Sequence, residues 1–176
     1  MDVTSGGAHS PLVILARNAI VAFVAEGRVL ELPADIPEML REPSAAFVSL
    51  KKRGDLRGCI GTIEPVCPSL AEEIVRNAIA AATQDPRFLP VRPNELGELS
   101  ISVDVLSPPE QVSSLDDFDP RRYGMVLRAG GRRGLLLPDL EGVDNPEEQY
   151  RIVCRKAGIA PGEPVDLYRF VVIRYH

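Results

Sequence analysis

The sequence is poor in the residues that most often build metal and redox sites. Its 176 residues include no tryptophan and two histidines, His9 and His176, which lie near the two ends. The three cysteines, Cys59, Cys67 and Cys154, are an odd number without a CxxC pair, so neither a disulfide framework nor a zinc ribbon is indicated. A Cys/His dyad is hard to build from histidines at the ends. We therefore expect reduced thiols, no metal and no cofactor.

The sequence also lacks long apolar runs and an excess of positive charge. Its longest apolar stretch, residues 11–25, is interrupted by Arg17 and Asn18 and falls short of the roughly 20 residues of a membrane-spanning helix. The residues before it include Asp2 and no Lys or Arg, unlike a secretory signal. We therefore expect a cytoplasmic protein without a membrane span. The net charge of -5 gives no general attraction to nucleic acid, which stays a minor hypothesis.

The residues that are present are typical of one globular domain. Hydrophobic residues make up 45% and charged residues 26% of the chain. Residues 1–9 are expected to form a flexible tail, and residues 10–176 a single domain. Periodicity and capping residues predict helices over 10–27, 69–84 and 145–158, and strands over 45–50, 56–63, 99–106, 124–129, 132–137 and 167–175. Hairpins interspersed with three helices favour an α+β fold, with a mainly antiparallel sheet and flanking helices.

The segment LRGCIGT, residues 56–62, is the most informative stretch. Gly58 and Gly61 weaken a strand unless another chain segment or a ligand approaches its backbone closely. Cys59 lies between these glycines, two residues from Arg57. An arginine beside a cysteine favours the thiolate, which is the nucleophilic and metal-binding form. The segment therefore indicates a site, although its chemistry is not specified.

The register of the hairpin that contains this segment decides what surrounds Cys59. Gly54 and Asp55 suit the two loop positions of a type II′ turn. With that turn, Cys59 faces Leu50 on the neighbouring strand. Cys59 and Arg57 then share one face of the sheet.

Two roles compete for Cys59. As a thiolate nucleophile or redox thiol, it would be activated by Arg57 and Lys52, with Glu64 or Asp85 as a base. As a structural residue, it would be a small side chain buried in a strand, which free cysteine often is. The residues alone leave both roles open.

Asp85 and Arg87 flank Pro86 at the predicted end of the second helix. Pro86 disfavours helical geometry at Asp85, so the local role of this segment is to end the helix. The planar guanidinium of Arg87 is also suited to binding a carboxylate or a phosphate. We include Asp85 and Arg87 in the candidate site as neighbours of Cys59.

The second predicted hairpin concentrates arginines. A turn at Gly130 and Gly131 puts Arg128 opposite Arg133, with Arg132 close by. Like charges directly across two strands are unfavourable unless solvent or an anion separates them. This hairpin therefore indicates either an anionic ligand or acidic partner, or cations that extend into water.

Five motifs occur in an order that is typical of one family. They are LRGCIGT at 56–62, DPRF at 85–88, SPPE at 107–110, GLLLP at 134–138 and CRKAG at 154–158. Over nearly the whole chain, they resemble the AMMECR domain family, whose bacterial and archaeal members are similar to component A of the AmmeMemoRadiSam system. The resemblance implies an α+β fold with a larger part that holds both termini and a smaller subdomain. It also implies a Memo-like protein and a radical SAM protein as partners, without an established activity.

The resemblance further implies a cleft near LRGCIGT as an active or binding site. Cys59 lies in this site by motif match, and the thiol chemistry described above makes it the candidate catalytic residue. The candidate binding residues from the motif are Leu56, Arg57, Gly58, Ile60, Gly61 and Thr62. Asp85 and Arg87 join them from the reasoning above.

We prefer a binding or accessory role, in which the protein recognises a Memo-like or radical SAM partner or its product. The alternative is a small enzyme in which Cys59 performs nucleophilic or redox chemistry on an acidic small molecule. A third hypothesis is RNA binding through Lys51, Lys52, Arg53 and the arginines of the second hairpin. The first predicts partner capture that persists in Cys59→Ser, whereas the second predicts that this change abolishes turnover.

Overall fold

The computed structural model describes residues 10–176, so the expected tail at 1–9 lies outside the described part of the chain. Two compact units form, the first from residues 10–105 and 174–176 and the second from residues 106–173. The first unit therefore holds both ends of the described chain. Both units combine an antiparallel sheet with helix, which confirms the predicted α+β fold class. The assignment of 10–176 to a single domain stays a prediction.

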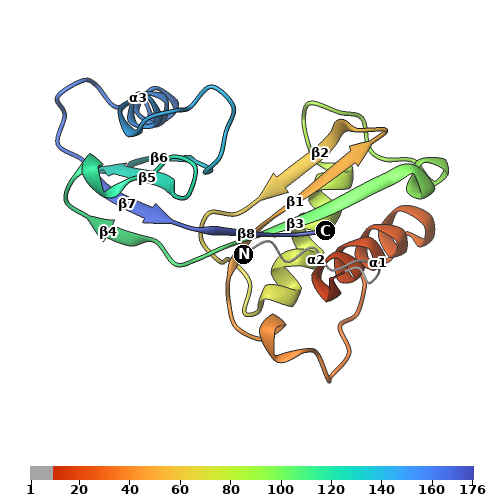
Figure 1. The fold of residues 1–176 in the computed structure, drawn as a ribbon. Helices are drawn as coiled ribbons and strands as arrows, with labels where there is room; N and C mark the ends of the chain where they lie inside the picture. The colour runs from red at the N-terminus through yellow and green to blue at the C-terminus, as the bar shows by residue number, and fades with distance from the viewer. Residues whose placement is uncertain (1–9) are drawn as a thin grey trace. The chain divides into compact units, whose positions relative to one another are not determined.

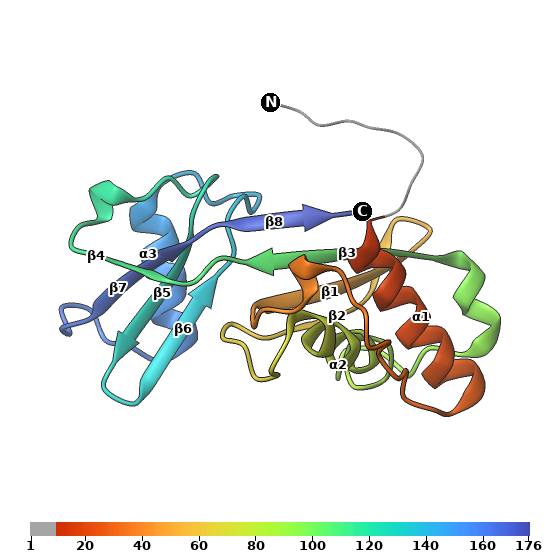
Figure 2. The same cartoon turned by 90° about the horizontal axis from the view of Figure 1, so that it is seen from below.

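The first unit contains a four-stranded sheet with two long helices on one face (Figures 1 and 2). Its elements are α1 (Pro11–Glu26), η1 (Glu38–Leu40), β1 (Ala45–Lys52), β2 (Asp55–Gly61), α2 (Leu70–Thr83), η2 (Pro93–Glu98), β3 (Leu99–Leu106) and β8 (Val172–Tyr175). The strands lie in the order β2, β1, β3, β8, so β2 and β8 are the edges. Alternate strand residues, such as Val48, Leu50 and Val103, are buried with both helices. The core of this unit therefore lies between the helices and one face of the sheet.

Local signals set the ends of α1 and α2, as the sequence predicts. The hydroxyl of Ser10 accepts a hydrogen bond from the Leu12 N–H (3.3 Å), and Gly27 ends α1 with a φ of 68°. Ser69 caps α2 by accepting from the N–H of Glu72 (3.3 Å).

Within residues 10–176, no helix is both long enough and apolar enough to span a membrane.

The hairpin of β1 and β2 differs from the predicted register. Its turn residues are Arg53 and Gly54, whose φ values of 53° and 90° are both positive, as in a type I′ turn. The predicted type II′ turn one residue later is therefore wrong. Together with a bulge at Arg57, this turn pairs Cys59 with Ser49 instead of Leu50. Because side chains alternate along a strand, this shift puts Cys59 on the face opposite to the buried Leu50.

A β-bulge lies between the turn and Cys59. Lys51 pairs with Leu56 and Leu50 pairs with Gly58, so Arg57 is the extra residue of β2. A bulge redirects the side chains around it. The side chain of Arg57 can therefore point toward a segment other than the paired strand β1.

The second unit is a four-stranded sheet with one helix on it (Figure 1). Its elements are β4 (Glu110–Val112), η3 (Leu115–Asp117), β5 (Gly124–Ala129), β6 (Arg132–Leu136), α3 (Pro146–Ala157) and β7 (Asp166–Phe170). The strands lie in the order β4, β7, β5, β6. Met125 and Leu127 of β5 are buried against Val153 of α3 in the core of this unit. The second hairpin and the third helix are thus confirmed, whereas β4 was not predicted.

The last predicted strand, over 167–175, is two strands in two different sheets. β7 belongs to the second unit and β8 to the first. Phe170 at the end of β7 is 3% exposed, whereas Tyr175 packs against the core of the first unit. Between the strands, the carbonyl of Val171 accepts from the Ser107 N–H (2.9 Å), and the Val171 N–H donates to the Ser107 hydroxyl (3.0 Å). The single-strand prediction failed because the residues continue in extended form while their partners change.

Candidate functional site

The two glycines of LRGCIGT are required by the packing of the chain itself. A Cβ atom at Gly58 would lie 2.1 Å from the carbonyl oxygen of Ala81 in α2. A Cβ atom at Gly61 would lie 2.2 Å from the ring of Phe47 on β1. Glycine therefore lets β2 lie directly against α2 on one side and against an aromatic ring on the other. Of the two explanations for these glycines, close approach of another chain segment is the one observed.

The backbone of Cys59 is bound by side chains of the DPRF segment. The Cys59 N–H donates to Oδ2 of Asp85 (2.9 Å), and Nη2 of Arg87 donates to the Cys59 carbonyl (3.5 Å). Because β2 is an edge strand, its outward peptide groups need partners other than a neighbouring strand. The structure thus brings Asp85 and Arg87 to Cys59, and it does so at the backbone.

Asp85 and Arg87 also form a bidentate ion pair with each other. Nε of Arg87 donates to Oδ1 (3.0 Å), and Nη2 donates to Oδ2 (2.7 Å). These hydrogen bonds outweigh the effect of burial, so the pKa of Asp85 lies well below its usual range and the pKa of Arg87 is raised. A carboxylate this acidic is a poor general base. A guanidinium whose planar fork is already filled is also a poor anion site.

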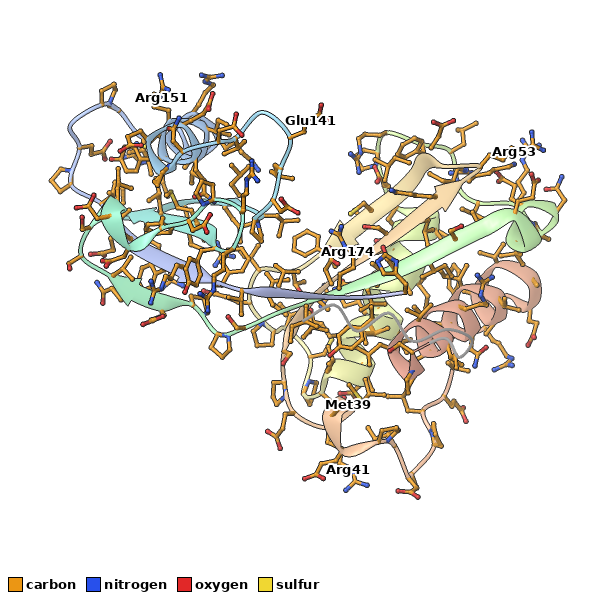
Figure 3. All side chains as sticks on the ribbon, viewed as in Figure 1. Met39, Arg41, Arg53, Glu141, Arg151 and Arg174 are labelled. Atoms are coloured by element: carbon orange, nitrogen blue, oxygen red, sulfur yellow. The ribbon has the colours of Figure 1, made fainter. Side chains whose placement is uncertain are left out.

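The thiol of Cys59 lies on the face of the sheet opposite to the helices. Its Sγ accepts a hydrogen bond from Oγ of Ser49, its cross-strand partner (3.2 Å). In this contact the Ser49 hydroxyl is a donor, so it is not the general base that a thiol nucleophile requires. On the same face, Asp104 of β3 is 3% exposed and binds Nε and Nη2 of Arg174 of β8, labelled in Figure 3 (2.7 Å each). The polar groups of this face therefore bind one another.

Arg57 is bound by Glu95 of η2. Its Nε and Nη2 donate to the two carboxylate oxygens of Glu95 (3.1 and 2.9 Å), and its Nη1 donates to the carbonyl of Leu89 (2.9 Å). Nζ of Lys52 donates to Oε1 of the same glutamate (3.1 Å). The two cations that the sequence assigns to the activation of Cys59 are thus both held by Glu95.

This ion network borders a cavity of about 290 Å³. The lining residues are Lys52, Arg57, Leu89, Pro90, Arg92, Asn94 and Glu95. Hydrogen bonds from Arg57, and then from the backbone N–H of Arg92, lower the pKa of Glu95 to about 2. Glu95 is therefore ionised at neutral pH and keeps Arg57 in place at the cavity wall.

A larger cavity of about 570 Å³ lies elsewhere in the first unit. Its apolar lining comes from Phe23, Leu30 and Leu32 on one side and from Val75 and Ile79 of α2 on the other. None of its lining residues belongs to LRGCIGT. The larger cavity is therefore separate from the candidate site.

Thr62, at the far end of the motif, is anchored to a buried carboxylate. Its hydroxyl donates to Oε1 of Glu73 in α2, and the N–H groups of Val66 and Cys67 donate to Oε2 (2.9 and 2.8 Å). Glu73 is 0% exposed. Burial raises its pKa, but these hydrogen bonds outweigh burial and leave the pKa below its ordinary value. Glu73 therefore fastens the loop after β2 to the helix.

The remaining motif residues differ in exposure. Leu56 is 41% exposed, whereas Ile60 packs against the core of the first unit. The carboxylates at the two ends of the motif, Glu95 and Glu73, were not singled out from the sequence.

Within residues 10–176, no group of three or more His, Cys, Asp or Glu side chains is placed to hold a metal ion.

The arginines of the second hairpin are held by protein groups. Arg128 and Arg133 pair across β5 and β6, which confirms the predicted register. The guanidinium of Arg128 stacks over the ring of Tyr168 (4.7 Å to its centroid), and Arg132 binds Glu163. These contacts compensate the clustered charge within the second unit. An anionic ligand at this hairpin stays a prediction.

Comparison with known proteins places these features in a family. The AMMECR1 family model matches residues 13–175. A protein of Thermotoga maritima is 52% identical over 96% of this chain and 98% of its own length. A Clostridium acetobutylicum protein is 46% identical over 94% of this chain, which spans 36% of that relative. The crystal structure of an uncharacterized Pyrococcus horikoshii protein matches with a TM-score of 0.82 and 35% identity, covering 93% of this chain and 88% of that chain. The chain therefore belongs to the AMMECR1 family.

Proposed function

We propose that the protein is a binding or accessory component, and that the LRGCIGT surface with Asp85 and Arg87 recognises its partner. The observation that carries this proposal is the use of the polar groups around Cys59. Asp85 binds its backbone, and Ser49 donates to its thiol. Each contact fixes the position of Cys59, and neither is a hydrogen bond from the thiol to a general base. A half-buried, well-fixed strand edge of this kind suits recognition better than nucleophilic catalysis.

The partners we propose are the Memo-like protein and the radical SAM protein that the family resemblance implies, in the cytoplasm. The length of the Clostridium relative supports a role beside other parts of a longer protein. The matched region makes up 98% of the Thermotoga protein but 36% of the Clostridium protein. The free thiols at Cys59, Cys67 and Cys154 are typical of a reducing compartment.

Partner capture by the full chain tests this proposal. We expect the wild type and Cys59→Ser to bind the Memo-like or radical SAM protein of the same genome with the same Kd. Leu56→Asp should weaken binding by about tenfold or more, because it puts a charge on an apolar contact of the motif. Leu140→Asp is the matched control, since Leu140 is 40% exposed and lies in the second unit, whereas Leu56 is 41% exposed. Equal weakening by the two variants, or no capture of either partner, contradicts the proposal.

The alternative function is a small enzyme that uses Cys59 as a nucleophile or redox thiol on an acidic small molecule. The observation that favours it is a free thiol that is only partly buried. This alternative predicts that Cys59→Ser abolishes turnover without changing the unfolding transition. Retained partner capture by the same variant supports the binding role instead.

A further inference from the structure

The cavity beside Arg57 carries an excess of positive charge. Lys52, Arg57 and Arg92 line it, and Glu95 is the one carboxylate among its lining residues. The whole chain, in contrast, has a net charge of -5. A concave site lined by cations concentrates field lines and attracts anions even on an acidic protein. The charge of the cavity lining therefore differs in sign from the net charge of the chain.

A second carboxylate nearby, Glu98, is offset by Arg53 and leaves this excess unchanged. Glu98 binds Nη2 of Arg53 (2.8 Å) and lies 3.5 Å from Nζ of Lys52. Neither Arg53 nor Glu98 lines the cavity. The cavity and its margin therefore contain four cations and two carboxylates, which leaves two positive charges in excess.

Glu95 acts as part of the cavity wall. It binds Arg57 through both oxygens and accepts the backbone N–H of Arg92 (2.9 Å). The carbonyls of Leu89 and Pro90 accept from the same guanidinium (2.9 and 3.4 Å). The side chain of Arg57 is consequently fixed and 16% exposed before any ligand arrives. A wall that is already ordered lowers the entropy cost of binding.

The groups that can reach a ligand stand at the rim of the cavity. Arg92 and Asn94 are exposed and supply guanidinium and amide donors. Lys52, with a side chain that is 28% exposed, adds an ammonium group from the hairpin. Leu89 is 77% exposed and, with Pro90, forms an apolar part of the lining. Cationic and apolar groups together suit an organic anion better than a bare inorganic ion.

We propose that this cavity binds a small organic anion, a carboxylate or a phosphate ester with a short apolar portion. Its volume of about 290 Å³ is close to the lower end of the range for small-molecule sites, roughly 300 Å³. The inference rests on the proposed function, because Arg57 belongs to LRGCIGT, and it specifies the class of ligand. It also assigns anion binding to this cavity and not to Arg87, whose guanidinium is already paired with Asp85.

An NMR titration of the full chain tests the inference. The probes are isovalerate, phenyl phosphate and inorganic phosphate, followed through backbone amide signals of residues 89–95 and the Nε–H signal of Arg57. We expect saturable shifts with an organic anion at a Kd on the order of 1 mM, and weaker binding of inorganic phosphate. Arg92→Gln should raise the Kd by about tenfold, because it removes a charge-assisted hydrogen bond.

The matched control is Arg53→Gln. It removes the same charge as Arg92→Gln, but from the turn between β1 and β2, where Figure 3 labels Arg53, and Arg53 does not line the cavity. We expect its Kd to change by less than about twofold, since an exposed charge outside the site is screened by salt. Equal weakening by both variants would mean general electrostatic attraction and would overturn the inference. Binding of an RNA oligonucleotide without any small anion, or no saturable shift, would also overturn it.

Partner capture separates this inference from the proposed function. A chain that captures its partner but binds none of the anions contradicts the anion site and leaves the proposed function standing. A chain that binds the anion, is sensitive to Arg92→Gln and captures neither partner confirms the anion site and contradicts the proposed function.

Discussion

The two ends of LRGCIGT are each held by a glutamate, and the two glutamates have opposite surroundings. Glu73, beside Thr62, is 0% exposed and is bound by a hydroxyl group and two backbone N–H groups. Glu95, beside Arg57, has a side chain that is 14% exposed, is bound by cations and borders a cavity. Neutral donors around a buried carboxylate make a structural anchor. Cations in excess around a partly open carboxylate make a surface suited to binding.

The largest effect on stability should come from Glu73, at the buried end of LRGCIGT. Glu73→Gln removes the charge and one acceptor oxygen from a side chain that is 0% exposed, so the charge-assisted hydrogen bonds from Thr62, Val66 and Cys67 are weakened or lost. We expect the free energy of unfolding to fall by about 3 kcal/mol, measured by urea unfolding at neutral pH. Glu72→Gln, on the exposed neighbour in α2, should cost less than about 1 kcal/mol. Similar losses for the two variants would contradict the anchoring role of Glu73.

A smaller effect should come from the middle of the motif. Gly58→Ala puts a Cβ atom 2.1 Å from the carbonyl oxygen of Ala81, so β2 and α2 must separate. We expect a loss of about 2 kcal/mol in the free energy of unfolding. Gly131→Ala is the control, because no atom lies within 4 Å of the added Cβ atom. If both alanines cost the same, the close approach of β2 to α2 is not what requires glycine.

The smallest effect on stability should come from Glu95, at the partly open end of LRGCIGT, and it should depend on pH. The pKa of Glu95 is about 2 in the folded protein, below its ordinary value of 4.5. Its contribution to stability is therefore complete above about pH 4.5 and is lost as the pH falls toward 2. Glu95→Gln should cost about 1.5 kcal/mol at neutral pH, the lower end for hydrogen bonds to a charged group. Between pH 5 and pH 3, urea unfolding should show a steeper loss for the wild type than for the variant, and equal slopes would contradict an ionised Glu95.

Helix ends and the buried anchor differ in how well the sequence predicts them. The caps at Ser10, Ser69 and Asn145 could be predicted because each acts on residues within one helical turn. The sequence does contain a signal for Glu73, although Glu73 is not among the predicted site residues. Together with Asn77, it is a polar residue at a position of α2 that the helical periodicity makes buried. A charged or amide residue on the apolar face of a helix is worth examining as an anchor for a neighbouring loop.

The register and the contacts of the site could not be predicted from local patterns. The turn lies one residue earlier than predicted because Arg53 adopts a positive φ, which is uncommon for any residue except glycine. The bulge at Arg57 then brings Cys59 opposite Ser49. Arg57 and Glu95 are 38 positions apart, and Cys59 and Asp85 are 26 positions apart. These pairs meet only because the chain after α2 returns along the edge of β2. Sequence patterns predict elements, whereas such pairs depend on the path between elements.

The rate of alkylation of Cys59 tests most directly whether this residue is held for recognition or activated for catalysis. The wild-type chain is treated with iodoacetamide at neutral pH, folded and in concentrated urea, and peptide mass spectrometry resolves the three cysteines. We predict that Cys59 reacts at least about tenfold more slowly in the folded chain, because its half-buried thiol is less accessible to the reagent than in the unfolded chain. A folded Cys59 that reacts faster than the unfolded one would be an activated nucleophile and would contradict the proposed binding role.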